Sequence, residues 1–332
     1  MTDLNIQWGM IGCGNVTEKK SAPSFNKIQG SRLVAVGNRT PERAQEYSRN
    51  YGVPTWHKDP FDVIRDPEVH IVYIATPPGS HMEYALESIR VGKPVYIEKP
   101  MARTWEECHL INEAAAKRGI PVYVAYYRRA LDYFGKVKEV IDSGVLGKLL
   151  YVNVQQHFPA REKDRDRKDP PWHVIPEISG GGYFHDVGCH ALDLLFYFFG
   201  DPLEVKGYAA NRGGLYDPED TLSVILKLPG NLLVSGSWNF VTPDPFKRDL
   251  VEVAGDKGRL KFSIFSFAPV TLIRETSRES FDIVQPEHIQ MPLIQTIVHE
   301  MRGHGSCPST GETAAVTSRV MDQVLGTFPF SP

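Results

Sequence analysis

The stretch IQWGMIGCGNVT, residues 6–17, decides how the chain begins to fold. An apolar, strand-like run ends at Gly12, and the pattern G-x-G-x-x-T follows, with Thr17 where a third glycine or alanine is usual. Glycines in such a turn let the backbone approach a pyrophosphate, which rests on the amide groups of the helix that follows. Ordinary tight turns use glycine too, but the position of this one in a first strand–helix turn favours dinucleotide binding. We therefore predict contacts to a dinucleotide from Gly12, Gly14, Asn15 and Val16.

Short β-rich runs alternate with helical patterns through the first 125 residues. Strand-like runs occupy residues 6–11, 31–38, 70–76, 93–98 and 120–126, and helical patterns occupy 41–52, 80–93 and 104–119. Strands that alternate with helices of this length indicate a parallel sheet built from βαβ units. The pattern predicts an α/β, Rossmann-type, doubly wound dinucleotide-binding domain over residues 1–125.

The remaining residues, 126–332, have a different character. A helix is expected over about 131–143, followed by a long strand-like run and then by the charged run REKDRDRKDPPW, residues 161–172, which we expect to be a solvated loop. Between residues 203 and 275 several β-type runs follow one another with turns and no helices between them, and helical patterns return near the C-terminus. Consecutive strands of this kind indicate an α+β domain with a large, mostly antiparallel sheet. We expect this second domain to bind the substrate and to mediate oligomerisation, and its last helix is a candidate to pack against the first domain.

Composition and charge exclude several classes of protein. With 332 residues, two domains are expected, and a net charge of −3 argues against nucleic acid as the main partner. No apolar stretch is long enough to cross a membrane, and the N-terminus lacks the basic start and apolar run of a signal peptide. The four cysteines are scattered, which suits reduced thiols in a cytoplasmic protein better than a disulfide framework.

Cofactor choice depends on the residues at the end of the second strand. An acidic side chain there would accept hydrogen bonds from the ribose of NAD, but this chain has Asn38 and Arg39. Arg39 and Thr40 could bind the additional phosphate of NADP, and no carboxylate would repel it. Alternatively, Arg39 covers the adenine, which would suit either cofactor. The sequence predicts NADP or NAD, with NADP slightly preferred and contacts from Asn38 and Arg39.

Two further turns follow strands of the expected parallel sheet. One contains Thr76, Pro77 and His81, and the other is Glu98-Lys99-Pro100. Ligands of open α/β sheets bind outside the carboxyl ends of the strands, so both turns are expected beside the cofactor. Lys99 could form a simple surface ion pair, or its ammonium could contact a substrate oxygen.

The segment GGGYFHDVGCHALD, residues 180–193, carries Asp186, His190 and Asp193. In a helix these residues would be spaced i, i+4 and i+7 and would share one face. That face could simply be solvated, and Asp186 could be an ordinary first-turn residue favoured by the helix dipole. His185, Asp186, Cys189 and His190 could also be considered as metal ligands, but no metal is expected.

Taken together, G-C-G-x-V, T-P-P-x-x-H, E-K-P and G-G-G-x-x-x-D-x-G-x-H-x-x-D resemble motifs of the glucose–fructose oxidoreductase / inositol dehydrogenase (Gfo/Idh/MocA) family. The resemblance covers nearly the whole chain and implies NAD(P)-dependent oxidation or reduction of sugars, cyclitols and related polyols. It implies catalytic roles for Lys99, Asp186 and His190, which would also bind the substrate. The family often has W-R before the glycine run; here Trp172-His173 stands there, and we expect His173 to contact the substrate.

The expected chemistry is reversible hydride exchange between the nicotinamide and a carbinol or carbonyl carbon. His190 would be the general acid/base, because histidine can take up and return a proton near neutral pH. Lys99 would stabilise charge on the same oxygen, and Asp186 would orient the imidazole or a neighbouring hydroxyl. Asp193 is assigned no definite role.

Two other functions remain open. The chain could be a non-catalytic sensor of a dinucleotide and a sugar, or a glycosidase that uses NAD for transient oxidation. The partners expected are a small sugar-like substrate and a second copy of the chain, in a homodimer or homotetramer, since the broad antiparallel sheet would leave one face exposed.

Overall fold

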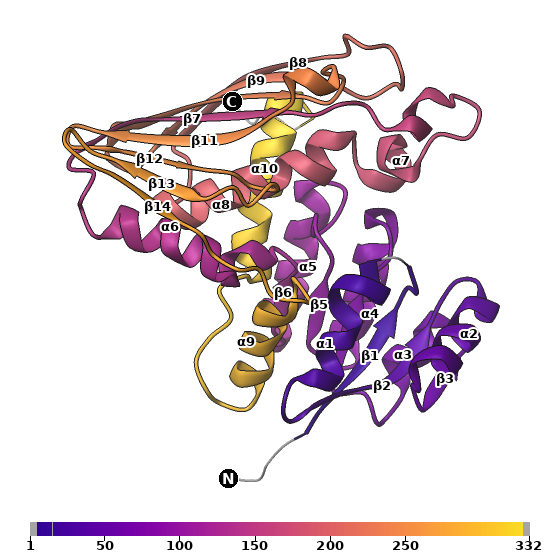
Figure 1. The fold of residues 1–332 in the computed structure, drawn as a ribbon. Helices are drawn as coiled ribbons and strands as arrows, with labels where there is room; N and C mark the ends of the chain where they lie inside the picture. Colours follow the sequence, from indigo (N-terminus) through magenta and orange to yellow (C-terminus); the bar gives the residue numbers. More distant parts are fainter. Residues whose placement is uncertain (1–4, 15, 328–332) are drawn as a thin grey trace. The chain divides into compact units, whose positions relative to one another are not determined.

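The structure, a computed structural model, describes residues 5–14 and 16–327. The chain divides into two compact units: unit 1 comprises Met1–Leu131 and Pro286–Ala315, and unit 2 comprises Asp132–Gln285 and Val316–Pro332. Figure 1 shows the elements of both units. Each unit is described by itself below.

This division differs from the single boundary expected after residue 125. The segment 286–315 belongs to unit 1 because it returns to the edge of the first sheet. There the Val124 N–H donates to the Ser309 carbonyl at 3.1 Å, the Ser309 hydroxyl donates to the Val124 carbonyl at 2.7 Å, and Tyr123 forms an antiparallel bridge with Thr310. Contacts between residues so distant in sequence leave no local composition signal.

Unit 1 is built on a six-stranded sheet, sheet A, in the order β3-β2-β1-β4-β5-β6. All of its paired strands are parallel. This architecture confirms the predicted Rossmann-type fold. The strands are β1 (Ile6–Ile11), β2 (Ser31–Gly37), β3 (Thr55–His57), β4 (Ile71–Ile74), β5 (Val95–Ile97) and β6 (Val122–Val124).

The helices of unit 1 begin and end at residues suited to those positions. Thr104 accepts a hydrogen bond from the Glu107 N–H as the N-cap of α5, and Gly119 ends that helix with a φ of 64°. The helices are α1 (Ala22–Lys27), α2 (Pro41–Tyr51), α3 (Pro60–Arg65), α4 (His81–Arg90), α5 (Trp105–Arg118) and α9 (Met291–Met301). The sequence analysis missed β3 and α3, because segments of three and six residues carry too little periodicity to be recognised.

Aromatic rings fill the core beneath sheet A. Trp8 lies 4.5 Å from Phe25 between ring centroids, and Tyr73 stacks on Tyr96 at 4.9 Å. Such pairs add to the apolar area that strands β1, β4 and β5 bury. The rigid core fixes the positions of the turns that leave these strands.

Unit 2 contains an eight-stranded sheet, sheet B, in the order β14-β13-β12-β11-β7-β10-β9-β8. Of its pairs, β7 and β10 run parallel and the others are antiparallel, as predicted for a mostly antiparallel sheet. The strands are β7 (Leu149–His157), β8 (Glu204–Ala210), β9 (Thr221–Leu228), β10 (Leu232–Asn239), β11 (Arg248–Gly255), β12 (Arg259–Phe262), β13 (Val270–Ile273) and β14 (Arg278–Phe281). The short strand β14 was not predicted.

Sheet B has one covered face and one exposed face. Along β9 the buried Leu222, Val224 and Leu226 alternate with the exposed Ser223 and Ile225, which is the period of a half-buried strand. Helices α6 (Asp132–Asp142) and α8 (Cys189–Phe199) lie on the covered side (Figure 1). Helix α10 (Gly311–Leu325) contributes its first residues to unit 1 and the rest to unit 2.

Among the described residues, none of the helices combines the length and the apolar character that crossing a membrane requires.

Candidate functional site

The glycine turn after β1 is built around a close approach between two backbone segments. Gly12 has a φ of 103°, and a Cβ at this position would lie 2.7 Å from the Ala75 carbonyl oxygen. Only glycine adopts this conformation readily and allows this approach. By contrast, a Cβ at Gly14 would meet no atom of the described residues within 4 Å, its chain neighbours aside. The turn therefore leaves open space beside Gly14, which is what a dinucleotide phosphate requires.

Thr17 closes the same turn from inside. Its hydroxyl donates to the Gly14 carbonyl at 2.7 Å and its N–H donates to the same oxygen at 2.9 Å. The threonine that departs from the usual G-x-G-x-x-G pattern therefore braces the loop. Val16, also predicted to contact the cofactor, is partly exposed at the start of the helical segment, and Asn15 lies outside the described residues.

The turn after β2 presents a cation and no acid. The Asn38 side chain accepts a hydrogen bond from the Thr40 N–H at 2.9 Å, which shapes the turn, and the next residue, Arg39, is exposed. The neighbouring strand β1 lies directly beside β2, so this turn and the glycine turn leave the same edge of the sheet. Arg39 is placed on that edge with an exposed side chain.

His81 connects the turn after β4 to the turn after β5. Its Nε2 lies 2.7 Å from the Thr76 carbonyl oxygen, and its Nδ1 lies 3.1 Å and 3.2 Å from the carbonyl oxygens of Pro100 and Met101. The side chain is completely buried. The structure thus gives His81 a bracing position between the two turns, whereas the sequence analysis expected a direct cofactor contact. Thr76 and Pro77 are partly exposed in the first of these turns.

Glu98 is likewise held by neighbouring groups. The Tyr73 hydroxyl donates to its Oε1 at 2.6 Å, the Gln290 amide donates to the same oxygen at 2.7 Å, and the Lys99 N–H donates to Oε2 at 3.3 Å. Burial raises the pKa of Tyr73, and the Glu98 carboxylate raises it further, so the hydroxyl remains a donor. This buried network fixes the backbone that carries Lys99, whose side chain is partly exposed.

In unit 2, a π-helical turn separates the two residues predicted to act together. Residues Phe184–Gly188 form this turn, and α8 begins at Cys189, so Asp186 and His190 do not lie on one regular α-helix as expected. Asp186 retains partial exposure, but His190 and Asp193 are buried. Wide turns of this kind often occur at functional sites. The burial of Asp193 also excludes a solvated face as the explanation of the motif.

Asp186 lies at the centre of a charged cluster. The Arg161 guanidinium donates from Nη2 to the Asp186 Oδ2 at 3.4 Å, and the His173 Nε2 lies 3.9 Å from the same oxygen. The His173 ring stacks on Trp172 with a centroid distance of 3.8 Å. The structure therefore brings together two of the predicted residues, Asp186 and His173, and adds Arg161.

The run 161–172 is mostly exposed, as expected, and Arg161 is itself exposed, but the sequence analysis did not anticipate its contact with Asp186. In the structure Asp164 of this run is buried, and it accepts hydrogen bonds from the Tyr183 hydroxyl at 2.5 Å and from the Arg161 N–H at 2.7 Å. These bonds attach the loop to the interior of unit 2. The alternating charges of the run gave no signal that singled out Arg161 or Asp164.

The charged cluster borders a cavity of about 240 Å³ in unit 2. The His190 ring lies 5.6 Å from the ring of Phe265, one of the residues lining this cavity. The lining is formed by Phe158, Pro159, Arg161, Tyr183, Val187, Phe240 and Phe265. His190 and Asp186 do not themselves line this largely aromatic cavity; each is connected to it through a lining residue, Phe265 and Arg161 respectively.

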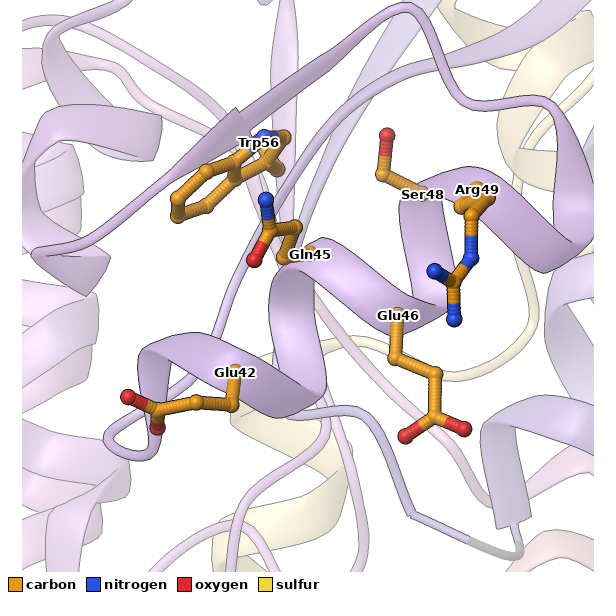
Figure 2. A pocket seen from close by; sticks show the side chains of 6 residues that line it. All are labelled: Glu42, Gln45, Glu46, Ser48, Arg49 and Trp56. Carbon is orange, nitrogen blue, oxygen red and sulfur yellow. The ribbon is translucent and has the colours of Figure 1, made fainter.

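A second hollow lies on the surface of unit 1. It has a volume of about 610 Å³ and is lined by Glu42, Gln45, Glu46, Ser48, Arg49 and Trp56. Figure 2 shows the Gln45 amide directed toward Trp56, while Glu42, Glu46 and Arg49 extend away from that ring. None of the predicted site residues lines it, so we do not assign it to the candidate site. Across the described residues, no three or more His, Cys, Asp or Glu side chains are grouped in a way that could hold a metal ion.

Comparison with family models matches both halves of the chain. Residues 6–126 match the model described as an oxidoreductase family with an NAD-binding Rossmann fold, and residues 134–261 match the GFO/IDH/MocA C-terminal domain. These two matches agree with the two sheets of the structure.

Relatives of known name match over most of the chain. Oxidoreductase P35 of Formosa agariphila is 36% identical over 98% of this chain and 100% of its own length. The scyllo-inositol 2-dehydrogenase (NAD(+)) of Bacillus subtilis is 25% identical over 94% of this chain and 89% of its own length.

Among solved structures, levoglucosan dehydrogenase in complex with NADH and levoglucosan superimposes with a TM-score of 0.86. The two sequences are 20% identical, and the superposition covers 97% of this chain and 97% of the levoglucosan dehydrogenase chain. At this level of identity the likeness demonstrates the shared fold.

Proposed function

The chain belongs to the Gfo/Idh/MocA family of oxidoreductases, and on that premise we propose that it transfers a hydride between a nicotinamide dinucleotide and a carbinol or carbonyl carbon of a sugar-like polyol. The observation that carries the proposal is that one chain has both an open glycine turn, in unit 1, and the Asp186 cluster beside an aromatic cavity, in unit 2. The substrates in the names of the two dehydrogenases above, an inositol and levoglucosan, support the polyol class.

The dinucleotide would be held by the turns at the carboxyl edge of sheet A. Gly12, Gly14 and Val16 would border its phosphates, with Asn15 as a further predicted contact, and Thr76 and Pro77 would border the other side of the site. His81 and Glu98 would serve the site through the turns that they brace. When bound, the dinucleotide supplies the group that accepts or donates the hydride.

The side chains of the protein would manage the proton and the charge on the reacting oxygen. In the direction of oxidation, His190 accepts the hydroxyl proton while Lys99 donates a hydrogen bond to the same oxygen as negative charge develops there. Asp186 would orient a substrate hydroxyl or the His190 imidazole. His173, whose Nε2 lies 3.9 Å from the Asp186 carboxylate, would contact the substrate from the same cluster.

For the cofactor, we propose a preference for NADP over NAD. The names of the two dehydrogenases above refer to NAD or NADH, but this chain has the exposed Arg39 after β2 and no acid at the end of that strand. A guanidinium at this position would pair with the additional phosphate. Replacing Arg39 with alanine should weaken NADP binding roughly tenfold or more and leave NAD binding nearly unchanged. Arg49→Ala, on the helix α2 that follows this turn, is the control and should leave the binding of both cofactors unchanged.

The test of the proposed reaction is cofactor reduction or oxidation against a panel of polyols, aldoses and their oxidised forms. Turnover with at least one of them, for the purified protein, would establish the activity. Dinucleotide binding without any turnover would instead indicate a sensor. Release of an aglycone from a glycoside without net reduction of NAD would indicate a glycosidase that uses transient oxidation.

We also propose that the exposed face of sheet B joins copies of the chain into a homodimer or homotetramer. Ile225 on β9 and Leu233 on β10 are exposed on this face, among small polar residues such as Ser223 and Ser235. Replacing Ile225 with glutamate should reduce the mass measured by light scattering, whereas Leu110→Glu on α5 should not. A wild-type monomer would refute the proposal.

All four cysteines are buried thiols, and no disulfide is formed in the described residues. This supports our proposal of a reducing, cytoplasmic setting.

A further inference from the structure

The aromatic cavity of unit 2 contains a single cationic side chain in its lining. Of the seven lining residues, Arg161 and Tyr183 carry polar side-chain atoms, and the other five are apolar. The Tyr183 hydroxyl donates to the buried Asp164 at 2.5 Å and is therefore already used. The polar character of the cavity consequently depends on the Arg161 guanidinium.

Two contacts orient this guanidinium, whose side chain is 49% exposed. Its Cζ lies 4.4 Å from the centroid of the Tyr183 ring, and its Nη2 donates to Asp186 at 3.4 Å. The backbone of Arg161 is attached through its N–H to Asp164. Within the described residues, the guanidinium donates no other hydrogen bond, so most of its N–H groups are available to a ligand. A fixed guanidinium loses little conformational entropy when it binds.

The lining of the cavity favours a ligand group that only accepts hydrogen bonds. A hydroxyl group both donates and accepts, and a hydroxyl buried against these aromatic walls would find no acceptor among the lining side chains. The nearby acceptor, Asp186, already contacts Arg161 and lies 3.9 Å from His173. A carboxylate accepts only, and its planar pair of oxygens matches the fork of an arginine.

The charges around the cavity are consistent with an anionic ligand. Besides Arg161, Lys247 lies over the outer aromatic wall, with its Nζ 5.8 Å from the Phe158 ring centroid. The negative groups are Asp186, which lies between Arg161 and His173, Asp164, which accepts from Tyr183, and Asp249, which accepts hydrogen bonds from the backbone N–H groups of residues 264–266. Of these three carboxylates, only Asp186 contacts the Arg161 guanidinium, and Lys247 adds attraction for an anion at the rim.

We propose that Arg161 binds a carboxylate of the substrate, so that the substrate is a sugar acid or a related polyhydroxy acid rather than a neutral polyol. The aromatic walls would pack against the apolar face of its carbon skeleton, and a cavity of about 240 Å³ limits the bound part to roughly one monosaccharide unit. This inference rests on the proposed oxidoreductase function and specifies its substrate class.

The test compares matched substrates that differ only at the terminal carbon: a hexuronic acid, the parent aldose, and a sulfate ester of that aldose. We expect the wild-type protein to have the highest kcat/KM for the uronic acid. Arg161→Met, which keeps an unbranched side chain over Tyr183, should lower kcat/KM for the acid roughly 10- to 100-fold more than it lowers kcat/KM for the aldose. Arg161→Lys should recover part of the loss, because it restores the charge without the fork.

Arg165→Met is the matched control, since Arg165 lies in the same loop, is exposed and does not line the cavity. An equal loss of kcat/KM for the acid and the aldose in Arg161→Met would overturn the proposal, because Arg161 would then only position Asp186. A wild-type preference for the neutral aldose would also overturn it, and a preference for the sulfate ester would replace the carboxylate by a tetrahedral anion.

Failure of the proposed function would look different. In that case the protein would turn over no substrate in the panel. The binding of the uronic acid would then be measured by calorimetry. Binding of the acid that is weakened in Arg161→Met but not in Arg165→Met would support the carboxylate site in the absence of catalysis, and equal affinities in all three proteins would refute it.

Discussion

Gly12 and Ala75 approach each other so closely that a Cβ on Gly12 would lie 2.7 Å from the Ala75 carbonyl oxygen. This contact joins the turn after β1 to the turn after β4, where Thr76 and Pro77 follow. Gly14, two residues further along the same turn, has open space instead. The two glycines therefore serve different purposes: Gly12 allows the backbone to pack, and Gly14 leaves room for a ligand.

We predict that Gly12→Ala destabilises the protein by about 2 kcal/mol or more, because it combines a φ of 103° with a backbone overlap. Gly14→Ala should leave the free energy of unfolding nearly unchanged but weaken dinucleotide binding. Urea unfolding and dinucleotide titration of both variants check this. Equal stability of Gly12→Ala and the wild type would contradict the assigned close approach.

The hydrogen bonds of Glu98 fix the backbone of Lys99, whose side chain is proposed to contact the reacting oxygen. Replacing Lys99 with methionine should lower kcat by roughly 10²- to 10³-fold, because the charge on the reacting oxygen would lose its donor. The dinucleotide dissociation constant should stay nearly the same. The exposed Lys117 on α5 offers the control, Lys117→Met. Unchanged turnover in Lys99→Met would remove Lys99 from the proposed mechanism.

His190 should control the pH dependence of the oxidation. A protonated imidazole cannot accept the hydroxyl proton, so wild-type kcat/KM for alcohol oxidation should fall toward acidic pH. His190→Asn should lower kcat/KM by roughly 10²- to 10⁴-fold and remove this acidic decline. His304→Asn, at an exposed position, should keep the wild-type profile. An acidic decline that persists in His190→Asn would assign the proton transfer to another group.

Glu219 lies against the glycine run that precedes the catalytic segment. A Cβ on Gly182 would lie 3.0 Å from the Glu219 carbonyl oxygen. The pKa of Glu219 is raised from 4.5 to about 7, mainly because the carboxyl is buried; Asp220 also raises it, while the N–H groups of Glu219 itself and of Gly182 lower it. The folded protein therefore binds a proton that the unfolded chain releases between these pH values.

The stability contributed by protonated Glu219 is thus present at low pH and is lost as pH rises from 4.5 through 7. The total change is on the order of 3 kcal/mol at most. Glu219→Gln should flatten this part of the pH profile of the free energy of unfolding, measured with urea. Glu275→Gln, at an exposed site, should not flatten it. A profile unchanged by Glu219→Gln would show that the carboxyl ionises normally.

His185 should make the free energy of unfolding change with pH in the opposite direction to Glu219. It is buried against Gly181, neither ring nitrogen has a hydrogen-bond partner among the described residues, and burial lowers its pKa from 6.5 to about 4. The unfolded chain then binds the additional proton, so stability is lost as pH falls from 6.5 to 4. His185→Leu should remove this acidic loss, in the same urea measurements. An identical acidic loss in His185→Leu would place its cause at another residue.

Much of the architecture could be predicted from local patterns. The alternation of β-rich and helical runs predicted the parallel sheet of unit 1, and the uninterrupted β-type runs predicted sheet B. Thr104, Gly119 and similar helix boundaries follow from the chemistry of single residues. The short β3, α3 and β14 were missed, since three to six residues do not establish a period.

The sequence also identified the individual motifs of the site, but it did not predict their backbone conformation or the hydrogen-bond partners of their side chains. The spacing of Asp186 and His190 predicted a regular helix, whereas the structure has a π-helical turn between them. The sequence analysis expected His81 and Glu98 beside the cofactor because of the turns that contain them. In the structure the His81 ring lies against the Thr76 carbonyl oxygen, and the Glu98 carboxylate accepts a hydrogen bond from the Tyr73 hydroxyl.

By itself, the sequence determined the two sheets, the glycine turn and the residues suited to hydride-transfer chemistry, because turn chemistry and hydrophobic period depend on near neighbours. The tertiary structure decided which charges of the run 161–172 gain partners: Asp164 is buried, whereas Arg161 remains exposed but contacts Asp186. Arg161 meets Asp186 across 25 residues, and Asp164 meets Tyr183 across 19. In the sequence Arg161 and Asp164 look like solvated charges and Tyr183 like an ordinary aromatic, since the pairing and burial of a charged group depend on partners that only the folded chain brings within reach.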